Sequence, residues 1–275
     1  MANRRTYGSY DDGCASAHAL DLIGERWALI VVRELILRPK RFADLQHDIP
    51  GIGPGVLSRR LHDLEENGIV LRRTLPRPAA VTVYDLTEWG RALEEVNAAL
   101  SRWAVRSPSL PLDADMSPDT LVLAMRAHAR PAPPNAPEST VGLTLTRDGE
   151  PAHYLATVTP TGTTIEATTI QPTATPDAAT TIQPGATPDA AATIPAGVRV
   201  GGAWVPAGMT MEAAAVPAGV RGDAAAIPAG VDAWVEASTK SWKSLVVAGA
   251  DLSAADVVIA GDKGAVRSLL AATRL

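Results

Sequence analysis

The amino-acid sequence predicts an α+β protein, with a winged helix-turn-helix domain followed by an α/β domain that holds a Pro/Ala/Gly-rich repeat insertion. One observation is a short amphipathic helix that is followed by a basic hairpin. Another is a pair of alternating strands joined by an Asp-Gly turn, with helical patterns on both sides. The third is a repeat over residues 168–231 that is poor in large apolar residues. We therefore expect domains at 1–106 and 118–275, joined by a linker at 107–117.

The composition argues against a membrane-spanning or disulfide-bonded secreted protein. No uninterrupted run of about 18 apolar residues is present. The charged N-terminus leads into Asp11 and Asp12 without an apolar signal segment. Cys14 is the single cysteine of the 275 residues, which excludes an internal disulfide and a multi-cysteine zinc site. We expect a cytoplasmic protein that does not bind a membrane.

Charge is divided unevenly along the chain. Residues 1–106 carry 15 Lys/Arg and 14 Asp/Glu, whereas residues 107–275 carry 10 and 16, which gives the total of −5. The basic residues of the first part are clustered, and clustered bases neutralise nucleic-acid phosphates. The acidic second part does not suit broad contact with nucleic acid.

The segment from Pro54 to Asn67 is predicted to be a recognition helix. Its leucines recur at helical spacing and give it one buried face, formed by Leu57, Leu61 and Leu64. Gly68 suits the left-handed position that commonly follows a helix. Shorter helical patterns precede this segment, and each ends at or before a glycine or proline: Gly24, Pro39 and Pro50.

Two extended runs, 69–75 and 80–86, follow the helix and bracket the Pro76-Arg77-Pro78 turn, so they predict a wing. The outward residues of the recognition helix are expected to read base edges: Ser58, Arg59 and Arg60. Other basic residues are expected to contact phosphates: Lys40, Arg41, Arg72, Arg73 and Arg77. The alternative is an ordinary surface helix followed by an edge hairpin.

A further helix is predicted to begin at Thr87, which can cap it. Its apolar residues alternate at spacings of three and four, as in a coiled-coil seam. The seam consists of Leu86, Trp89, Leu93, Val96, Leu100 and Trp103. We expect Trp89, Leu93, Val96, Leu100 and Trp103 to pair with a second copy of the chain, which gives a homodimer. The alternative is a helix that lies on the core of its own domain.

The second domain is predicted to begin with a helix capped by Ser117 and to continue with a hairpin around Asp148-Gly149. A strand around 163–169 follows. After the repeat, Ser238 is expected to cap a helix, and a strand at 256–260 leads into a closing helix at 263–275. Because the repeat has proline in every period, a low-complexity loop is favoured over a small solenoid.

With these residues in view, the chain over about 14–104 resembles the HxlR family of bacterial winged helix-turn-helix regulators, which are relatives of the MarR type. The resemblance rests on a series of short motifs in order: Cys14, Leu22–Leu29, Arg33–Leu35, Lys40–Leu45, Ile49–Ile52, Leu57–Leu61, Leu64–Gly68 and Tyr84–Thr87. It implies a double-stranded DNA partner. The family's cysteine is usually followed by proline, whereas Ala15 follows Cys14 here.

The second domain resembles the sterol carrier protein-like lipid-binding fold. This resemblance rests on Arg147–Glu150, Thr239–Trp242 and Ile259–Asp262. It implies a hydrophobic small-molecule effector, and we expect Trp234 and Trp242 to line the pocket. The alternative is that these tryptophans simply fill the core.

No catalytic constellation is present, and the histidines lack metal-ligand spacing, so we expect no enzyme activity, cofactor or metal. Cys14 is the candidate redox residue, but a buried and inert cysteine is favoured.

We expect a transcriptional regulator, with repression as its mode of action, that a hydrophobic effector controls. The alternatives are a protein that sequesters a lipid or lipophilic drug, a redox-responsive regulator acting through Cys14, and an enzyme acting on a lipid-like substrate, against which the lack of an acid/base pair counts.

Overall fold

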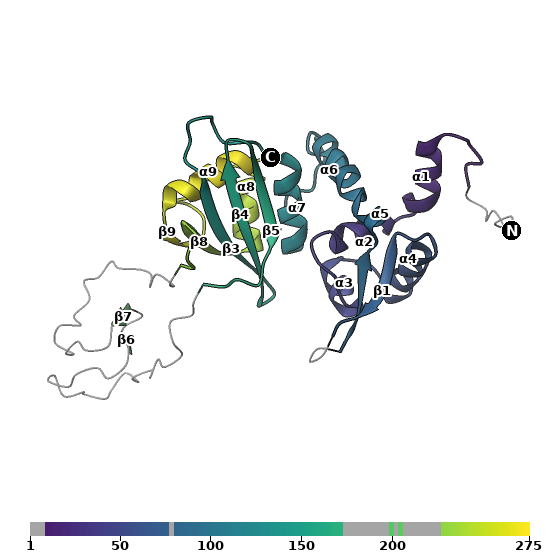
Figure 1. Cartoon of the computed structure of the whole chain (residues 1–275), viewed down its shortest axis with the longest axis horizontal. Helices are drawn as coiled ribbons and strands as arrows, with labels where there is room; N and C mark the ends of the chain where they lie inside the picture. Colours follow the sequence, from purple (N-terminus) through teal and green to yellow (C-terminus); the bar gives the residue numbers. More distant parts are fainter. Residues whose placement is uncertain (1–8, 77–79, 173–197, 201–202, 206–226) are drawn as a thin grey trace.

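A computed structural model describes residues 9–76, 80–172, 198–200, 203–205 and 227–275. Figure 1 shows a helical N-terminal part with a small sheet, and a C-terminal part in which helices pack on a larger sheet. Arg77 and most of the predicted repeat insertion lie outside the described residues. A short hairpin pairs β6 (Val198–Val200) with β7 (Ala203–Val205).

Four helices precede the wing: α1 (Ala15–Ile23), α2 (Ala28–Leu35), α3 (Phe42–Asp48) and α4 (Pro54–Glu66). The predicted recognition helix is α4. Pro54 occupies its first turn, where a backbone N–H has no partner in the helix and proline therefore loses nothing. Gly68 has a φ of +71°, a left-handed conformation that lets the chain leave the helix without strain.

The wing consists of β1 (Val70–Thr74) and β2 (Thr82–Leu86), paired antiparallel with Val70 opposite Leu86. Lys40 forms an isolated bridge with Tyr84, which joins the segment before α3 to the wing. The predicted helix and hairpin are thus confirmed as a winged helix-turn-helix.

The helix predicted to begin at Thr87 is in fact two helices, α5 (Glu88–Arg91) and α6 (Leu93–Ala104). Thr87 caps α5 as predicted, because its hydroxyl accepts a hydrogen bond from Gly90 N. The break at Ala92 places Trp89 on a different helix from the other seam residues. The seam is therefore not one continuous helical stripe.

The C-terminal part begins with α7 (Pro118–His128), followed by β3 (Ser139–Arg147), β4 (Glu150–Thr159) and β5 (Gly162–Ala167). Ser117 caps α7 by accepting a hydrogen bond from Thr120 N. Asp148 and Gly149 have φ values of +51° and +85°, as required by the two-residue hairpin turn that their sequence predicts.

After the insertion come β8 (Ala233–Ser238), α8 (Thr239–Val246), β9 (Val257–Gly261) and α9 (Lys263–Thr273). The strands form one sheet in the order β5-β4-β3-β8-β9, in which β3 and β8 are parallel and the other pairs antiparallel. The sequence patterns did not predict β8, which runs directly into the helix that Ser238 caps, or the short β6–β7 hairpin within the repeat. The other elements of this part were predicted.

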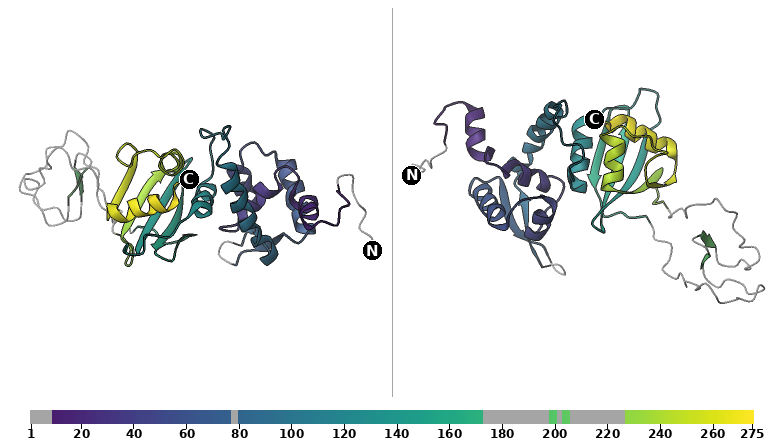
Figure 2. Two further views of the ribbon diagram at one scale, coloured as in Figure 1. Left: turned by 90° about the horizontal axis from the view of Figure 1, so that it is seen from above. Right: turned by 180° about the vertical axis from the view of Figure 1, so that it is seen from behind.

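Helices α7, α8 and α9 cover one face of this sheet (Figure 2). Because strand residues alternate between faces, Val141, Leu143 and Leu145 of β3 all point toward the helices. They form one core with Tyr154 of β4 and with Trp242 of α8, which is fully buried.

Trp234 lies on the opposite face of the sheet. In the register of the sheet it stands beside Gly142, and a Cβ added to Gly142 would come within 2.0 Å of the indole ring. The indole Nε1 donates a hydrogen bond to Thr144 Oγ1 at 2.9 Å. Position 142 therefore requires glycine, because any side chain there would clash with the indole ring of Trp234.

A second hydrophobic core lies beneath α4 and the wing, and α7 contributes to both cores. Leu123 packs into the N-terminal core with Leu35 and Leu57, whereas Leu121 and Met125 pack into the C-terminal core. The predicted domains thus share a helix and are packed against one another.

Candidate nucleic-acid interface

Helix α4 presents Ser58 and Arg59 to solvent. Leu57, Leu61 and Leu64 are at most 1% exposed and fix the opposite face of the helix on the core. Because these leucines recur every three or four residues, the intervening Ser58 and Arg59 lie outward, and both are exposed. This placement agrees with the predicted role of the two residues in base contacts.

Arg60 differs from its neighbour Arg59. Its side chain is only 12% exposed, and its guanidinium pairs with Asp63 at 3.0 Å and with Glu25 at 3.4 Å. The guanidinium of Arg60 is therefore already paired with two carboxylates of its own chain. These ion pairs indicate that Arg60 helps to hold α4 in place, rather than making the base contact that was predicted for it.

The wing presents two exposed arginines on β1, and the guanidinium of each contacts a side chain of β2. The Arg72 guanidinium lies 5.6 Å from the centre of the Tyr84 ring, which is opposite it in the register. Arg73 pairs with Asp85 at 2.9 Å yet remains 43% exposed. Asp85 also pairs with Arg91, a basic residue that sequence analysis did not single out.

Arg41 is exposed at the start of α3, where its backbone N–H donates a hydrogen bond to Asp44 Oδ2 at 2.9 Å. The side chain has no ion pair among the described residues, so it is free to meet a phosphate. Arg77 was predicted to act in the same way and lies outside the described part of the chain.

The prediction that Lys40 contacts phosphate is corrected by its position. Lys40 is 5% exposed, and its Nζ lies 2.9 Å from Glu34, 2.7 Å from Asp48 and 2.8 Å from Asp119. Burial by itself lowers the pKa of the ammonium, but the three carboxylates raise it above its ordinary value. Lys40 is therefore a buried cation with its counter-ions already in place.

Glu34, Lys40, Asp48 and Asp119 form a buried ionic cluster that joins α2 to α7. Glu34 is fully buried and accepts hydrogen bonds from Ser117 Oγ at 2.9 Å and from Thr120 Oγ1 at 2.6 Å. Burial raises the pKa of Glu34, but Lys40, Arg33 and the hydrogen bond from Thr120 outweigh it and lower the pKa below its ordinary value.

Asp119 extends the buried ionic cluster toward the large sheet. It accepts hydrogen bonds from Arg38 at 2.9 Å and from the Tyr154 hydroxyl at 2.7 Å. The sequence patterns did not predict these contacts. The available signal was Glu34, a carboxylate that follows an apolar helical run and Arg33, because a buried carboxylate needs a partner.

The predicted dimerisation seam is largely exposed. Trp89 is 57% exposed and Trp103 is 72% exposed, and Val96 and Leu100 are also exposed. Leu93, by contrast, packs against the N-terminal core. Helix α1 has no buried residue, and Leu20 on it is 51% exposed. Trp89, Val96, Leu100 and Trp103 thus remain available for a partner.

Cys14 was expected to be buried and inert, and the structure corrects this expectation because Cys14 is exposed at the start of α1. Its Sγ lies 3.0 Å from Ser16 Oγ. Hydrogen bonds from the Ser16 side chain and from the backbone of Ser16 and Ala17 lower the pKa of the thiol. A lowered pKa favours the reactive thiolate.

The tryptophans that were expected to line an effector pocket are both buried. Trp234 is 1% exposed and Trp242 is fully buried, and their rings fill space against the two faces of the sheet. Neither tryptophan lines the cavity between α6, α7 and β5 or the cavity along β9 and α9.

Within the described ranges, no helix has the length and apolar character needed to cross a membrane. The same residues bring together no group of His, Cys, Asp or Glu side chains that would hold a metal ion.

The HxlR-like helix-turn-helix family model matches residues 22–109. The transcriptional regulator YodB of Bacillus subtilis is 40% identical over 86 residues, which are 31% of this chain and 77% of YodB. The solved reduced form of YodB covers 37% of this chain and 98% of its own, with 35% identity and a TM-score of 0.32. The redox regulator HypR in its oxidized form is 31% identical and covers 35% of this chain and all of its own, with a TM-score of 0.33.

Proposed function

Since the chain belongs to the HxlR family of helix-turn-helix proteins, we propose that it is a transcriptional regulator that binds double-stranded DNA as a homodimer and acts as a repressor. The observation that carries the proposal is the exposure of Ser58 and Arg59 on α4, next to the exposed Arg72 and Arg73 on the wing. Figure 1 shows α4 beside the first strand of the wing.

The exposed residues divide into two roles. Ser58 and Arg59 lie on the helix that a major groove accepts, so they are the proposed base contacts. The residues proposed to contact phosphates are Arg41, Arg72, Arg73 and Arg77. We leave Lys40 out of this set because its ammonium is buried among carboxylates.

Dimerisation is proposed to occur through the exposed apolar residues Trp89, Val96, Leu100 and Trp103, together with α1. An exposed apolar stripe of this kind is favourable only when a partner covers it. A two-fold axis between two wings then requires a pseudo-palindromic operator, with half-sites separated by about one helical turn, roughly 34–36 Å, or by a multiple of it.

The dimer is tested by Leu100→Asp combined with Trp103→Asp, measured by sedimentation. We expect monomers, because a carboxylate within a covered apolar seam is costly. Val258→Asp is the control, since Val258 is a similarly exposed apolar residue on β9. A seam variant that still sediments as a dimer would refute the proposed interface.

DNA binding is tested by gel shift with the DNA that lies directly upstream of the gene. We expect a specific complex that survives an excess of unrelated competitor DNA. A protein that only sequesters a ligand would show no preference for this fragment, so the same measurement separates the two functions.

The C-terminal part is proposed to be the regulatory part, and the resemblance to the sterol carrier fold makes a hydrophobic effector the first expectation. Trp234 and Trp242 are not retained as pocket residues because both are packed in place. A titration with lipophilic compounds that changes the fraction of bound operator would support a hydrophobic effector.

A second candidate function is redox regulation through Cys14. The observation that favours it is the exposed thiol with its lowered pKa at the start of α1. Because Cys14 is the single cysteine, oxidation must produce either an intersubunit disulfide or a mixed disulfide with a small thiol. Release of operator DNA by a thiol oxidant, lost in Cys14→Ser, would establish this function.

A further inference from the structure

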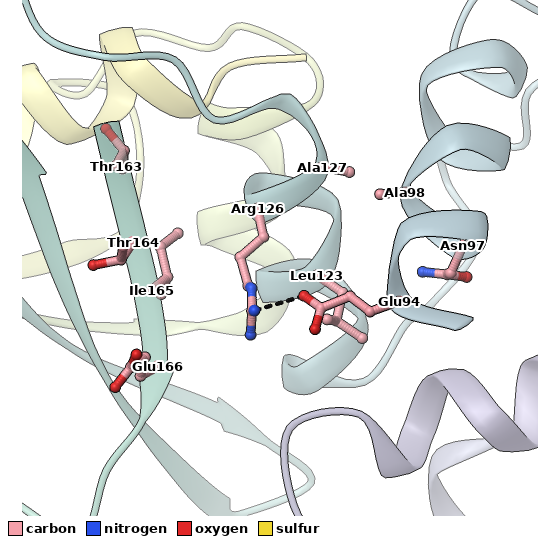
Figure 3. A pocket seen from close by; sticks show the side chains of 10 residues that line it. All are labelled: Glu94, Asn97, Ala98, Leu123, Arg126, Ala127, Thr163, Thr164, Ile165 and Glu166. Atoms are coloured by element: carbon pink, nitrogen blue, oxygen red, sulfur yellow. Dashed lines mark ion pairs between the residues drawn. The ribbon is translucent and has the colours of Figure 1, made fainter. Parts of the chain in front are cut away.

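A cavity of about 260 Å³ lies where the N-terminal and C-terminal parts meet. Helix α6 forms one wall, the edge strand β5 forms the other, and α7 runs between them (Figure 3). The small residues Ala98 of α6 and Ala127 of α7 face each other in its wall. A ligand held here would touch both halves of the chain at once.

Three charged side chains line this cavity. Arg126 and Glu94 point toward each other and pair at 2.6 Å, and about a third of each side chain is exposed (Figure 3). A guanidinium has five N–H donors, and within the described ranges the Arg126 side chain pairs with Glu94 alone. Its remaining donors are available to a second acceptor.

Glu166 of β5 is the third charged residue of the wall, and it is exposed. It has no ion pair in the described part of the chain. The wall thus combines one guanidinium, which accepts a carboxylate in a bidentate manner, with a free carboxylate that suits an ammonium group. Asn97 and Thr164 add neutral hydrogen-bonding groups.

We propose that this cavity binds a small zwitterion of the amino-acid class. Its carboxylate pairs with Arg126 and its ammonium pairs with Glu166. The volume lies below the roughly 300–1,000 Å³ of pockets for drug-sized ligands, which limits the ligand to about the size of an amino acid. A ligand without an ammonium leaves Glu166 unpaired, and a ligand without a carboxylate leaves the donors of Arg126 that Glu94 does not use without an acceptor.

The effect of the ligand on DNA binding rests on the proposed function. Helix α6, which lines the cavity, also carries the exposed seam residues Val96 and Leu100. A ligand wedged between α6 and β5 changes how α6 is held against the C-terminal part. In a dimer paired through α6, this alters the spacing of the two recognition helices. The ligand therefore regulates operator binding.

The experiment is isothermal titration of the full-length protein with a panel of free proteinogenic amino acids. We expect saturable binding of at least one of them at millimolar concentration. Its N-acetyl derivative lacks the ammonium and its amide derivative lacks the carboxylate, so each should bind about tenfold to a hundredfold more weakly. Failure of every amino acid to bind, or equal binding of the derivatives, would overturn the proposal.

Variants of residues inside and outside the cavity test whether the ligand binds there. Arg126→Gln and Glu166→Gln should each weaken binding about tenfold or more, whereas Arg106→Gln and Glu138→Gln, exposed and outside the cavity, should not. Ala98→Leu fills the cavity without touching a charge and should abolish binding while thermal unfolding shows that the variant is folded. Unchanged affinity in Ala98→Leu would place the ligand elsewhere and refute this site.

Operator binding without added ligand is measured in parallel. A protein that binds its operator but no zwitterion contradicts the inference and leaves the proposed function standing. A protein that binds zwitterions but no DNA contradicts the proposed function, and the site in the cavity stands.

Discussion

Basic side chains of this protein lie in two regions with different surroundings. In the buried ionic cluster, Lys40 is 5% exposed and has three carboxylates within 3 Å. Arg41, the next residue, is exposed, as are Arg59, Arg72 and Arg73, and these four form the exposed basic surface. Two neighbouring basic residues can therefore have different roles. A basic residue that is buried among carboxylates links two helices, whereas one that is exposed can contact a phosphate.

The largest expected effect is that of Lys40→Met on stability. Removing the cation leaves Glu34 and Asp119 buried without their main partner, which costs about 3–5 kcal/mol. Arg41→Ala, on the exposed side, should change the free energy of unfolding by less than about 0.5 kcal/mol. Urea unfolding of both variants checks the contrast, and equal losses would show that the two regions do not differ as described.

The buried ionic cluster should also make the protein sensitive to acid. The pKa of Glu34 is lowered from its ordinary value of 4.5, so its contribution to stability is complete above that value. The contribution is lost as the pH falls through the lowered pKa. Urea unfolding between about pH 6 and about pH 3 should show a steeper loss in the wild type than in Glu34→Gln. Parallel pH profiles would contradict this assignment.

On the exposed basic surface, Arg59→Ala should affect discrimination between DNA sequences and leave the fold intact. Loss of a base contact costs about 1–3 kcal/mol at one position of the operator. Competition between the operator and single-base variants measures this effect. If Arg59→Ala weakens binding to all sequences by the same factor, Arg59 contacts phosphate instead.

The smallest effect on DNA binding is expected for Arg73→Ala. Arg73 shares Asp85 with Arg91, so its removal leaves Asp85 paired and the wing in place. Binding to all sequences should weaken alike, and the slope of log K against log salt should fall by about one unit. Affinity measured over a series of salt concentrations tests this, and an unchanged slope would remove Arg73 from the phosphate contacts.

Much of the fold was predictable because local patterns determine it. Leu57, Leu61 and Leu64 indicate the face of α4, and Asp148-Gly149 indicates the hairpin turn. The strand β8 was missed because Ala233–Ser238 is short and lacks clear alternation beside the helix that follows. Its place between β3 and β9 depends on parallel pairing with β3, which is distant in the sequence.

The site was predictable only where exposure follows from helical spacing, as for Ser58 and Arg59. Lys40 was misassigned because its counter-ion Asp119 lies far along the chain, on α7. The tryptophans were misassigned for a related reason, since the space beside Trp234 is set by Gly142 on another strand. Such long-range contacts leave no periodic signal in the sequence.

The sharing of α7 between two cores bears on how this protein can be divided. A fragment that ends in the predicted linker would lose Leu123 from the core beneath α4. It would also lose Asp119, Ser117 and Thr120, and Glu34 would meet water where it now meets hydroxyl groups. A fragment or chimera that keeps the N-terminal core intact must therefore carry α7 with it.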